Sequence, residues 1–347
     1  MRILICSFDF YPRIGGTESA GMTLAKGLCE RGYEVTVATM TAGANDDATF
    51  PFRVVRQPGA TQLLRLFQAA DLVWHNHVSL RLLWPLSLAR RPLVLVHHCP
   101  LATDTGPGPR FGGLKRAACM LGHNAFVSDA YRKSARLSGP VIYNTYDEAN
   151  FHVWPDVARD RDVVFLGRLV REKGADILVD ALALLAAKGK RLHATIIGSG
   201  PQHEELQAHV ASRGIADLVE FTGALRGEAL SRTLARHRMM AMPSRWFEGL
   251  PISAVEALAC GCVVVGADSG GLPEAIGACG LVVPRNSAAG LAAALERLTV
   301  DSALYESCAA QIAQHLKLFS KAALMDHCEQ LIREATRGHP ASTAAGA

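Results

Sequence analysis

Several features that many proteins of this size carry are missing from this sequence. No apolar run approaches the roughly 20 residues that a membrane-spanning helix needs. The nine cysteines include no CxxC pair, which favours reduced thiols in a cytoplasmic protein. The amino terminus is apolar only briefly before Asp9, so we predict a buried strand there and no signal peptide. What remains is a chain of 347 residues, 49% of them apolar, which is long enough for two domains of ordinary size.

A strong net charge is also missing, but the charge is unevenly distributed. The net charge is +4, and residues 71–140 hold nine Lys or Arg against three Asp, a local excess of six. This excess fits either a solvated face or, over residues 110–136, a patch that meets anionic lipid head groups at the inner face of the plasma membrane. No aromatic-interleaved basic motif accompanies it, so we expect no nucleic-acid partner.

The first half of the chain alternates short apolar runs with helical patterns. Strands that alternate with helices predict a parallel sheet covered on both faces. The predicted strands are residues 2–6, 34–39, 52–56, 72–75, 93–97, 125–127 and 141–143, and residues 17–31 form the first predicted helix.

The same pattern begins again after an aperiodic, charged segment at 144–162, which we interpret as the linker. The predicted strands are 163–166, 193–197, 219–221, 239–242, 263–266 and 280–283, and the predicted helices are 174–188, 201–213, 227–236, 251–260, 271–276 and 287–298. The sequence therefore predicts an α/β fold of two tandem Rossmann-like, doubly wound domains, 1–150 and 151–319, that face each other across a cleft. A last helix at 320–336 lies beyond the second domain, and the tail 339–347 is expected to be disordered.

Two carboxylates eight residues apart, Glu248 and Glu256, bracket a predicted loop-to-helix junction. Such a junction directs backbone N–H groups and the positive end of the helix dipole at a bound anion. A phosphate-bearing ligand with hydroxyls on either side would suit it, and the alternative is a capped amphipathic helix with one exposed Glu.

Glycines and two cations follow other predicted strands. Gly15 and Gly16 open the first helix and either admit a ligand close to the backbone or form a plain turn. They do not form the GxGxxG dinucleotide fingerprint. Arg168 and Lys173 follow the first strand of the second domain, where two cations would neutralise a diphosphate. Further glycine turns follow at Gly198 and Gly200 and at Ser269-Gly270-Gly271.

Taken in order, these motifs resemble the GT-B-fold retaining glycosyltransferases of family 4. The resemblance covers essentially the whole chain, and the second-domain motifs are the more specific. It rests on Gly15-Gly16, the run 167–174, Ile197–Pro201, Met242–Ser244, Glu248-x7-Glu256, Ala259–Gly261 and Gly270-Gly271.

The resemblance implies a role for each matched position on the donor side. Arg168 and Lys173 would hold the donor diphosphate, Glu256 would bond the ribose hydroxyls and Glu248 would lie near the transferred sugar. The other implied donor-binding residues are Gly15, Gly16, Gly198, Gly200, Gly249, Leu250, Pro251 and Ile252. Glu248, Arg168, Lys173 and His97 would form the catalytic set.

The catalytic histidine has two candidates, and the sequence differs from the family's pattern at two places. His97 resembles the histidine that touches the donor sugar in this family, with His98 as the second choice and a buried core histidine as the alternative. Pro251 stands where many relatives have Gly, and Asn144–Asp147 replaces an Asn-Gly-Val-Asp turn. The resemblance also implies that the last helix crosses back to the first domain.

A metal cofactor is not expected. His75, His77 and the His97-His98-Cys99 run contain ligand types at the ends of neighbouring strands, but without the close cysteine pairs of structural zinc sites. Asp160-Arg-Asp162 matches a DxD motif of another glycosyltransferase architecture and lies in the linker, so we interpret it as coincidence.

The sequence thus predicts a retaining glycosyltransferase that moves a sugar from a nucleotide-diphosphate donor to a hydroxyl of a sugar or lipid-linked acceptor. Bacterial surface polysaccharide, lipopolysaccharide or glycolipid synthesis is the expected setting, with no cofactor. A nucleotide-sugar 2-epimerase of the same architecture, a nicotinamide-dependent oxidoreductase and a non-catalytic sugar-nucleotide-binding protein remain alternatives.

Overall fold

The computed structural model describes residues 1–13, 15–43, 47–98 and 112–337. The chain divides into two compact units. Unit 1 comprises residues 1–145 and 321–347, and unit 2 comprises residues 146–320. The chain therefore enters unit 2 once and returns to unit 1 through its last helix. The expected boundary lay at 150, and the tail 339–347 lies outside the described residues.

Unit 1 is a parallel six-stranded sheet in the order β3-β2-β1-β4-β5-β6. This is the doubly wound Rossmann order. Strands are added toward one edge from β1 to β3 and toward the other edge from β4 to β6, so the order reverses between β1 and β4. Its strands are β1 (Arg2–Ser7), β2 (Glu34–Thr39), β3 (Arg53–Arg56), β4 (Leu72–Asn76), β5 (Leu93–His97) and β6 (His123–Phe126). Its helices are α1 (Gly16–Glu30), α2 (Ala60–Ala69), α3 (Leu80–Leu83), α4 (Gly112–Cys119), α5 (Asp129–Ala135) and α13 (Lys321–Thr336).

Unit 2 repeats the design with a parallel sheet in the order β12-β11-β10-β7-β8-β9, so its reversal point lies between β7 and β10. Its strands are β7 (Arg161–Leu166), β8 (Ala194–Ile197), β9 (Val219–Gly223), β10 (His237–Met242), β11 (Val263–Ala267) and β12 (Gly280–Val283). Its helices are α6 (Ala175–Ala187), α7 (His203–Ser212), α8 (Gly227–Ala235), α9 (Ile252–Ala259), α10 (Leu272–Ile276), α11 (Ala288–Val300) and α12 (Ser302–Leu316).

The predicted fold class is confirmed, and the twelve sheet strands coincide with predicted ones to within a few residues. Two details were wrong. Residues 141–143 form only one isolated bridge, between Val141 and Phe126, because the chain leaves β6 at once toward Asn144. Helix α12 was not predicted; Asp301 caps it by accepting a hydrogen bond from the Leu304 N–H at 2.9 Å.

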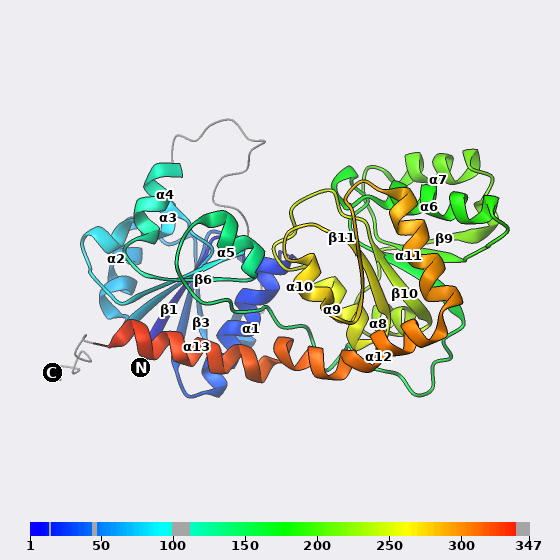
Figure 1. Cartoon of the computed structure of the whole chain (residues 1–347). Coiled ribbons are helices and arrows are strands. Elements are labelled where there is room, and N and C mark those ends of the chain that lie inside the picture. Colours follow the sequence, from blue (N-terminus) through cyan, green and yellow to red (C-terminus); the bar gives the residue numbers. More distant parts are fainter. Residues whose placement is uncertain (14, 44–46, 99–111, 338–347) are drawn as a thin grey trace. The chain divides into compact units, whose positions relative to one another are not determined.

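Helix α13 packs on α1 within unit 1 (Figure 1). Gly27 allows the close approach, because a Cβ there would lie 2.3 Å from the Met325 sulfur. Arg31 joins the helices through Asp326 at 2.8 Å and Glu329 at 2.9 Å. The residues that are described include no helix long and apolar enough to cross a membrane.

Candidate active site

The candidate site of unit 2 lies at the reversal point of its sheet. Loops that follow the two strands flanking such a point diverge and leave a crevice at the carboxyl edge. Here the loop after β7 carries Arg168 and Lys173, and the loop after β10 carries Glu248. The topology alone therefore brings the predicted cations and the predicted acid to one edge.

Side-chain contacts join two of these residues directly. Lys173 Nζ lies 2.6 Å from Glu248 Oε1, and the Ser244 hydroxyl donates to the same oxygen at 2.5 Å. The lysine side chain is 28% exposed and the glutamate side chain 11%. The pair is thus held mostly out of water while the ammonium stays accessible. Charge-assisted hydrogen bonds of this kind fix both groups in one orientation.

The Glu248 backbone is fixed by the glycine turn after β11. Gly270 has φ +57°, and a Cβ there would lie 2.0 Å from the Glu248 carbonyl oxygen. The Gly271 N–H donates to that same oxygen at 2.8 Å. Ser269 Oγ also donates to the Trp246 carbonyl. The Gly270-Gly271 motif therefore serves to lock the Glu248 loop.

Arg245 was missed by sequence reasoning. Its guanidinium makes two hydrogen bonds of 2.6 Å to the Asp176 carboxylate at the start of α6. A third bond of 2.9 Å reaches the Arg171 carbonyl. These contacts tie the β10–α9 loop to the segment that carries Lys173. No local pattern could have revealed them, because the partners are 69 and 74 residues away.

Helix α9 presents its amino end without a side-chain cap, since Pro251 precedes it. The N–H groups of Ile252 and Ser253 are therefore open to a ligand anion, whereas the Ala254 N–H donates to the Pro251 carbonyl at 3.1 Å. At the other end Arg159 donates to the carbonyls of His237, Cys260 and Gly261 at 2.7–3.1 Å. A Cβ at Gly261 would lie 2.4 Å from that guanidinium, which explains the glycine of the Ala259–Gly261 motif.

Glu256 projects from α9 and is half-buried. Burial, and secondarily the charge of Asp147, raises the pKa of its carboxyl to about 7. A carboxyl group whose pKa is about 7 accepts hydrogen bonds from hydroxyl groups when it is ionised and can donate one when it is protonated. Asp147 comes from the segment that replaces the family's Asn-Gly-Val-Asp turn.

Arg168, Gly198 and Gly200 are the other predicted donor residues on the loops after β7 and β8. The Arg168 side chain is exposed and makes no ion pair in the part of the chain that the structure describes. Gly198 and Gly200 are explained by packing, because a Cβ would lie 1.8 Å from the Gly167 carbonyl and 2.4 Å from the Leu169 carbonyl. Their geometry needs no ligand, so donor contact there stays a prediction.

The matching edge of unit 1 is built around Asn76, at the end of β4. Its Nδ2 donates to Ser7 Oγ at 3.2 Å and to the Thr17 carbonyl at 3.0 Å, which connects β1 to the start of α1. A Cβ at Gly15 would meet the Glu18 carboxylate, whereas nothing lies within 4 Å at Gly16. Open space at an uncapped helix start is compatible with close approach of a ligand at Gly16.

The two candidate histidines differ sharply in placement. His97 is fully buried, stacks on Phe126 at 4.9 Å and bonds Asn124 Oδ1 through Nε2 at 2.8 Å. His98 keeps some exposure and bonds Asn76 Oδ1 at 2.7 Å. Burial lowers the pKa of both rings, that of His98 to about 3, so both are neutral at pH 7. Of the two, His98 is connected to the carboxyl-edge residue Asn76.

Metal ligands do not gather in the described residues, where no cluster of three or more His, Cys, Asp and Glu side chains occurs. Asp160 pairs with Arg236 at 2.7 Å, and Asp162 accepts the His193 N–H at 2.9 Å. The DxD-like pair is thus engaged in local structure. Cys99 lies outside the described residues.

Comparison with known proteins places these observations in a family. A GDP-mannose-dependent alpha-(1-6)-phosphatidylinositol monomannoside mannosyltransferase of Mycobacterium tuberculosis is 32% identical over 347 aligned positions, which cover 86% of this chain and 89% of that protein. The family description "Glycosyl transferases group 1" matches residues 147–315. The chain belongs to the group 1 glycosyltransferases. This group 1 enzyme also resembles a D-inositol 3-phosphate glycosyltransferase of Jonesia denitrificans, at 36% identity over 46% of the chain and 39% of the relative.

Solved structures agree with the fold of this glycosyltransferase. Anabaena HepE in complex with UDP superposes with a TM-score of 0.81 at 22% identity, over 96% of this chain and 100% of that one. Sucrose-phosphate synthase of Thermosynechococcus elongatus gives 0.78 at 21% identity, over 97% and 99%. The two-unit architecture is that of GT-B glycosyltransferases.

Proposed function

We propose that this glycosyltransferase moves a sugar, with retention of configuration, from a nucleotide-diphosphate donor to a hydroxyl of a sugar or lipid-linked acceptor. The observation that carries the proposal is the Lys173–Glu248 pair, 2.6 Å apart at the reversal point of unit 2 and beside the uncapped start of α9. A cation, open helix amides and an acid with a fixed backbone suit a diphosphate with a sugar attached.

The chemistry follows from where charge develops. When the glycosidic bond to the diphosphate breaks, negative charge grows on the departing phosphate oxygens. In this proposal Lys173, Arg168 and the backbone N–H groups of Gly249, Leu250 and Ile252 stabilise that charge without a metal ion. Glu248, held by Lys173 and Ser244, orients the sugar. In front-face attack the departing phosphate oxygen helps to take the acceptor proton, and no protein nucleophile is needed.

Glu256 reads the nucleotide in this proposal. A carboxylate accepts hydrogen bonds from both ribose hydroxyls, whereas the protonated form presents fewer acceptors. Because the pKa of this carboxyl is raised to about 7, the charged form prevails only above neutrality. Donor affinity should therefore increase between pH 6 and pH 8.

The acceptor is assigned to unit 1, where charge and apolar exposure coincide on and after α4. Leu114, Met120 and Leu121 are 58%, 82% and 69% exposed, and Lys115 and Arg116 lie on the same helix. Apolar side chains beside cations are typical of a helix at an anionic lipid surface. This supports peripheral binding through residues 110–136, of which 110 and 111 lie outside the described part.

The donor and the reaction can be tested together. GDP-mannose, the donor of the mycobacterial relative, and UDP-glucose, which Anabaena HepE binds in another solved structure, are the first donors to try. The matching donor should raise the melting temperature, and the increase should grow with the logarithm of its excess over Kd. Nucleoside diphosphate release should require an acceptor, and NMR of the product should show the donor's anomeric configuration. Release without acceptor and without a new glycosidic bond would contradict the proposal and favour an epimerase.

Membrane docking needs its own assay. Sedimentation with phosphatidylglycerol-rich vesicles at low salt should capture the protein, and the double variant Leu114→Ser, Met120→Ser should release most of it. The same substitution at exposed Leu88, which lies outside 110–136, is the matched control. Failure of the wild-type chain to sediment would overturn this part of the proposal.

A further inference from the structure

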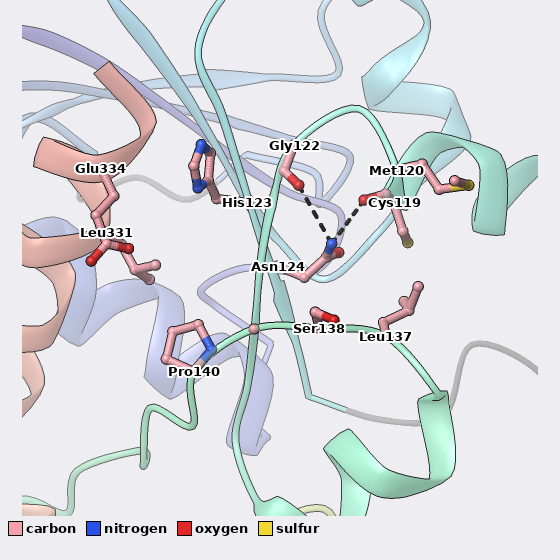
Figure 2. Close-up of a pocket in the computed structure, with 11 residues that line it drawn as sticks. Cys119, Met120, Gly122, His123, Asn124, Leu137, Ser138, Pro140, Leu331 and Glu334 are labelled. Carbon is pink, nitrogen blue, oxygen red and sulfur yellow. Dashed lines mark hydrogen bonds between the residues drawn. The ribbon is translucent and has the colours of Figure 1, made fainter. Parts of the chain in front are cut away.

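Unit 1 contains an open cavity of about 480 Å³ that takes no part in the donor site (Figure 2). It lies across the start of β6, an edge strand of the sheet, between α13 and the loop 137–140. The donor-side residues lie instead at the carboxyl ends of strands. The cavity is therefore at the opposite, amino edge. Its volume falls within the roughly 300–1,000 Å³ of small-molecule sites.

Three polar side chains of the cavity keep hydrogen-bonding capacity, whereas the Asn124 amide is already bonded at both atoms. The side chains of His123 and Ser138 are exposed and make no hydrogen bond within the described part of the chain, and Glu334 accepts one only at Oε1, from Gln330 at 2.9 Å. An imidazole, a hydroxyl and a free carboxylate oxygen can each pair with a ligand hydroxyl. Apolar surface from Leu137, Pro140 and Leu331 lies among them.

This composition selects among ligand classes. No Lys or Arg of the described residues lines the cavity, so a phosphate or nucleotide would meet no cation among them. An added peptide strand is also excluded, because the edge of β6 is already covered. A Cβ at Gly139 would lie 2.1 Å from the Asn124 carbonyl, and the Ile142 N–H donates to the Phe126 carbonyl at 2.7 Å. A neutral molecule that has an apolar face ringed by hydroxyls fits both kinds of wall.

We propose that this cavity is a second carbohydrate site, which takes a pyranose unit at the amino edge of the unit 1 sheet, opposite to the edge that carries Gly15 and Gly16. The choice of a sugar rests on the proposed function, because the hydroxyl-bearing acceptor and product are the carbohydrates this enzyme meets. The pyranose is either a free monosaccharide or part of an acceptor chain, and both present the same hydroxyls and apolar ring face.

Asn124 gives the cavity a connection to the buried histidine. Its Nδ2 donates to the Cys119 carbonyl at 2.8 Å and to the Gly122 carbonyl at 3.4 Å, as Figure 2 shows. Its Oδ1 bonds His97 Nε2 at 2.8 Å, and His97 Nδ1 is buried without a partner in the described residues. A sugar that shifts the Asn124 amide therefore changes the one hydrogen bond that the His97 ring makes within the described residues.

The test is a saturation-transfer NMR titration of the full chain with methyl α-mannopyranoside and α-1,6-mannobiose, with GDP and UDP present in excess to fill the donor site. We expect saturable binding and a shift of the His97 ring resonance. Glu334→Gln should weaken binding about tenfold through loss of a charged acceptor. Ser138→Trp should abolish it by filling the cavity, whereas Ser134→Trp, on α5 outside the lining, should not.

Three outcomes overturn the proposal: no saturable binding, binding that Ser138→Trp leaves intact, or an equal loss in Ser134→Trp. Tighter binding of the disaccharide identifies an acceptor chain as the source, and equal binding identifies a free sugar. Thermal shift by nucleotide confirms that each variant is folded. Sugar transfer is measured on the same samples. If transfer fails while binding still depends on Ser138, the proposed function is wrong and the cavity proposal stands. If transfer occurs without such binding, the cavity proposal is wrong and the proposed function stands.

Discussion

Units 1 and 2 have the same strand order, but different side chains lie at their reversal points. In unit 2 the edge carries ion pairs, Lys173–Glu248 and Arg245–Asp176, on loops locked by glycine. In unit 1 the corresponding edge carries neutral groups, Asn76 and His98, joined by one hydrogen bond. The difference shows that the shared topology supplies only the position of a site. Among the described residues, unit 1 carries the exposed Arg13–Asp9 pair on the loop after β1, whereas the mostly buried Lys173–Glu248 pair lies at the reversal point of unit 2.

Removing the cations of unit 2 should have the largest effect. We expect Lys173→Ala or Arg168→Ala to lower kcat by roughly 10²–10³, as loss of one charge-stabilising donor does elsewhere. Lys188→Ala is the matched control, because Lys188 forms a surface pair with Glu296 at 3.4 Å. Full activity in either site variant, measured by nucleoside diphosphate release, would sink the diphosphate assignment.

Breaking the locked loop should come next. Gly270→Ala forces an alanine into the left-handed region and onto the Glu248 carbonyl, so it should cost more than the roughly 1–2 kcal/mol of strain alone. Gly32→Ala in unit 1 is the matched control, with φ +82° and nothing within 4 Å. Urea unfolding should show the larger loss for Gly270→Ala, together with reduced transfer. Equal losses would mean that the lock contributes nothing.

Acid should reduce the stability of unit 1, because two of its histidines are kept neutral by burial. Burial lowers the pKa of His75 and His77 to about 4. Between pH 6.5 and pH 4 these two rings are therefore neutral in the folded protein but protonated in the unfolded chain. The stability of unit 1 is present above pH 6.5 and is lost as pH falls toward 4. His75→Leu should therefore raise the melting temperature more at pH 5 than at pH 8.

His237 in unit 2 is the control for that experiment. Burial lowers the pKa of its ring to about 4 as well, but both nitrogens are bonded, to the Thr233 carbonyl at 2.7 Å and Thr195 Oγ at 2.9 Å. His237→Leu leaves those partners unpaired, so it should destabilise at both pH values. Stabilisation by both variants would show that hydrogen bonding does not distinguish them.

The smallest effect concerns Glu256. Its raised pKa means that the folded state holds a proton up to about pH 7 while the unfolded carboxyl loses its proton near 4.5. Stability from this group is thus full below 4.5 and is lost as pH rises through 7. At pH 8.5 Glu256→Gln should melt at a higher temperature than wild type, by roughly 2–4 °C per kcal/mol. At pH 4.5 the variant and wild type should melt at the same temperature.

Calorimetry at the two pH values measures that shift, with Glu204→Gln, an exposed acid on α7, as the control. A melting-temperature gain that is the same at both pH values would contradict the titration argument. Donor affinity measured on the same samples should rise from pH 6 to pH 8 in wild type and stay flat in Glu256→Gln.

The sequence could predict the fold because hydrophobic periodicity is local, and the family motifs mark the strand ends. It also predicted Lys173 and Glu248, which the topology brings together. It could not predict Arg245–Asp176 or Asn76–His98, because those contacts join residues whose proximity depends on strand order. Gly198 and Gly200 look like ligand-binding glycines in sequence, yet close backbone packing already requires them.

The return of the chain to unit 1 through α13 makes unit 2 an inserted domain. Residues 1–145 hold the six strands of the first sheet but lack the helix that covers α1. During synthesis, unit 2 is complete when residue 320 has emerged, whereas unit 1 must wait for α13. The unit that begins first is therefore finished last. A chain that stops at residue 320 would contain a complete unit 2 joined to a unit 1 with one exposed face.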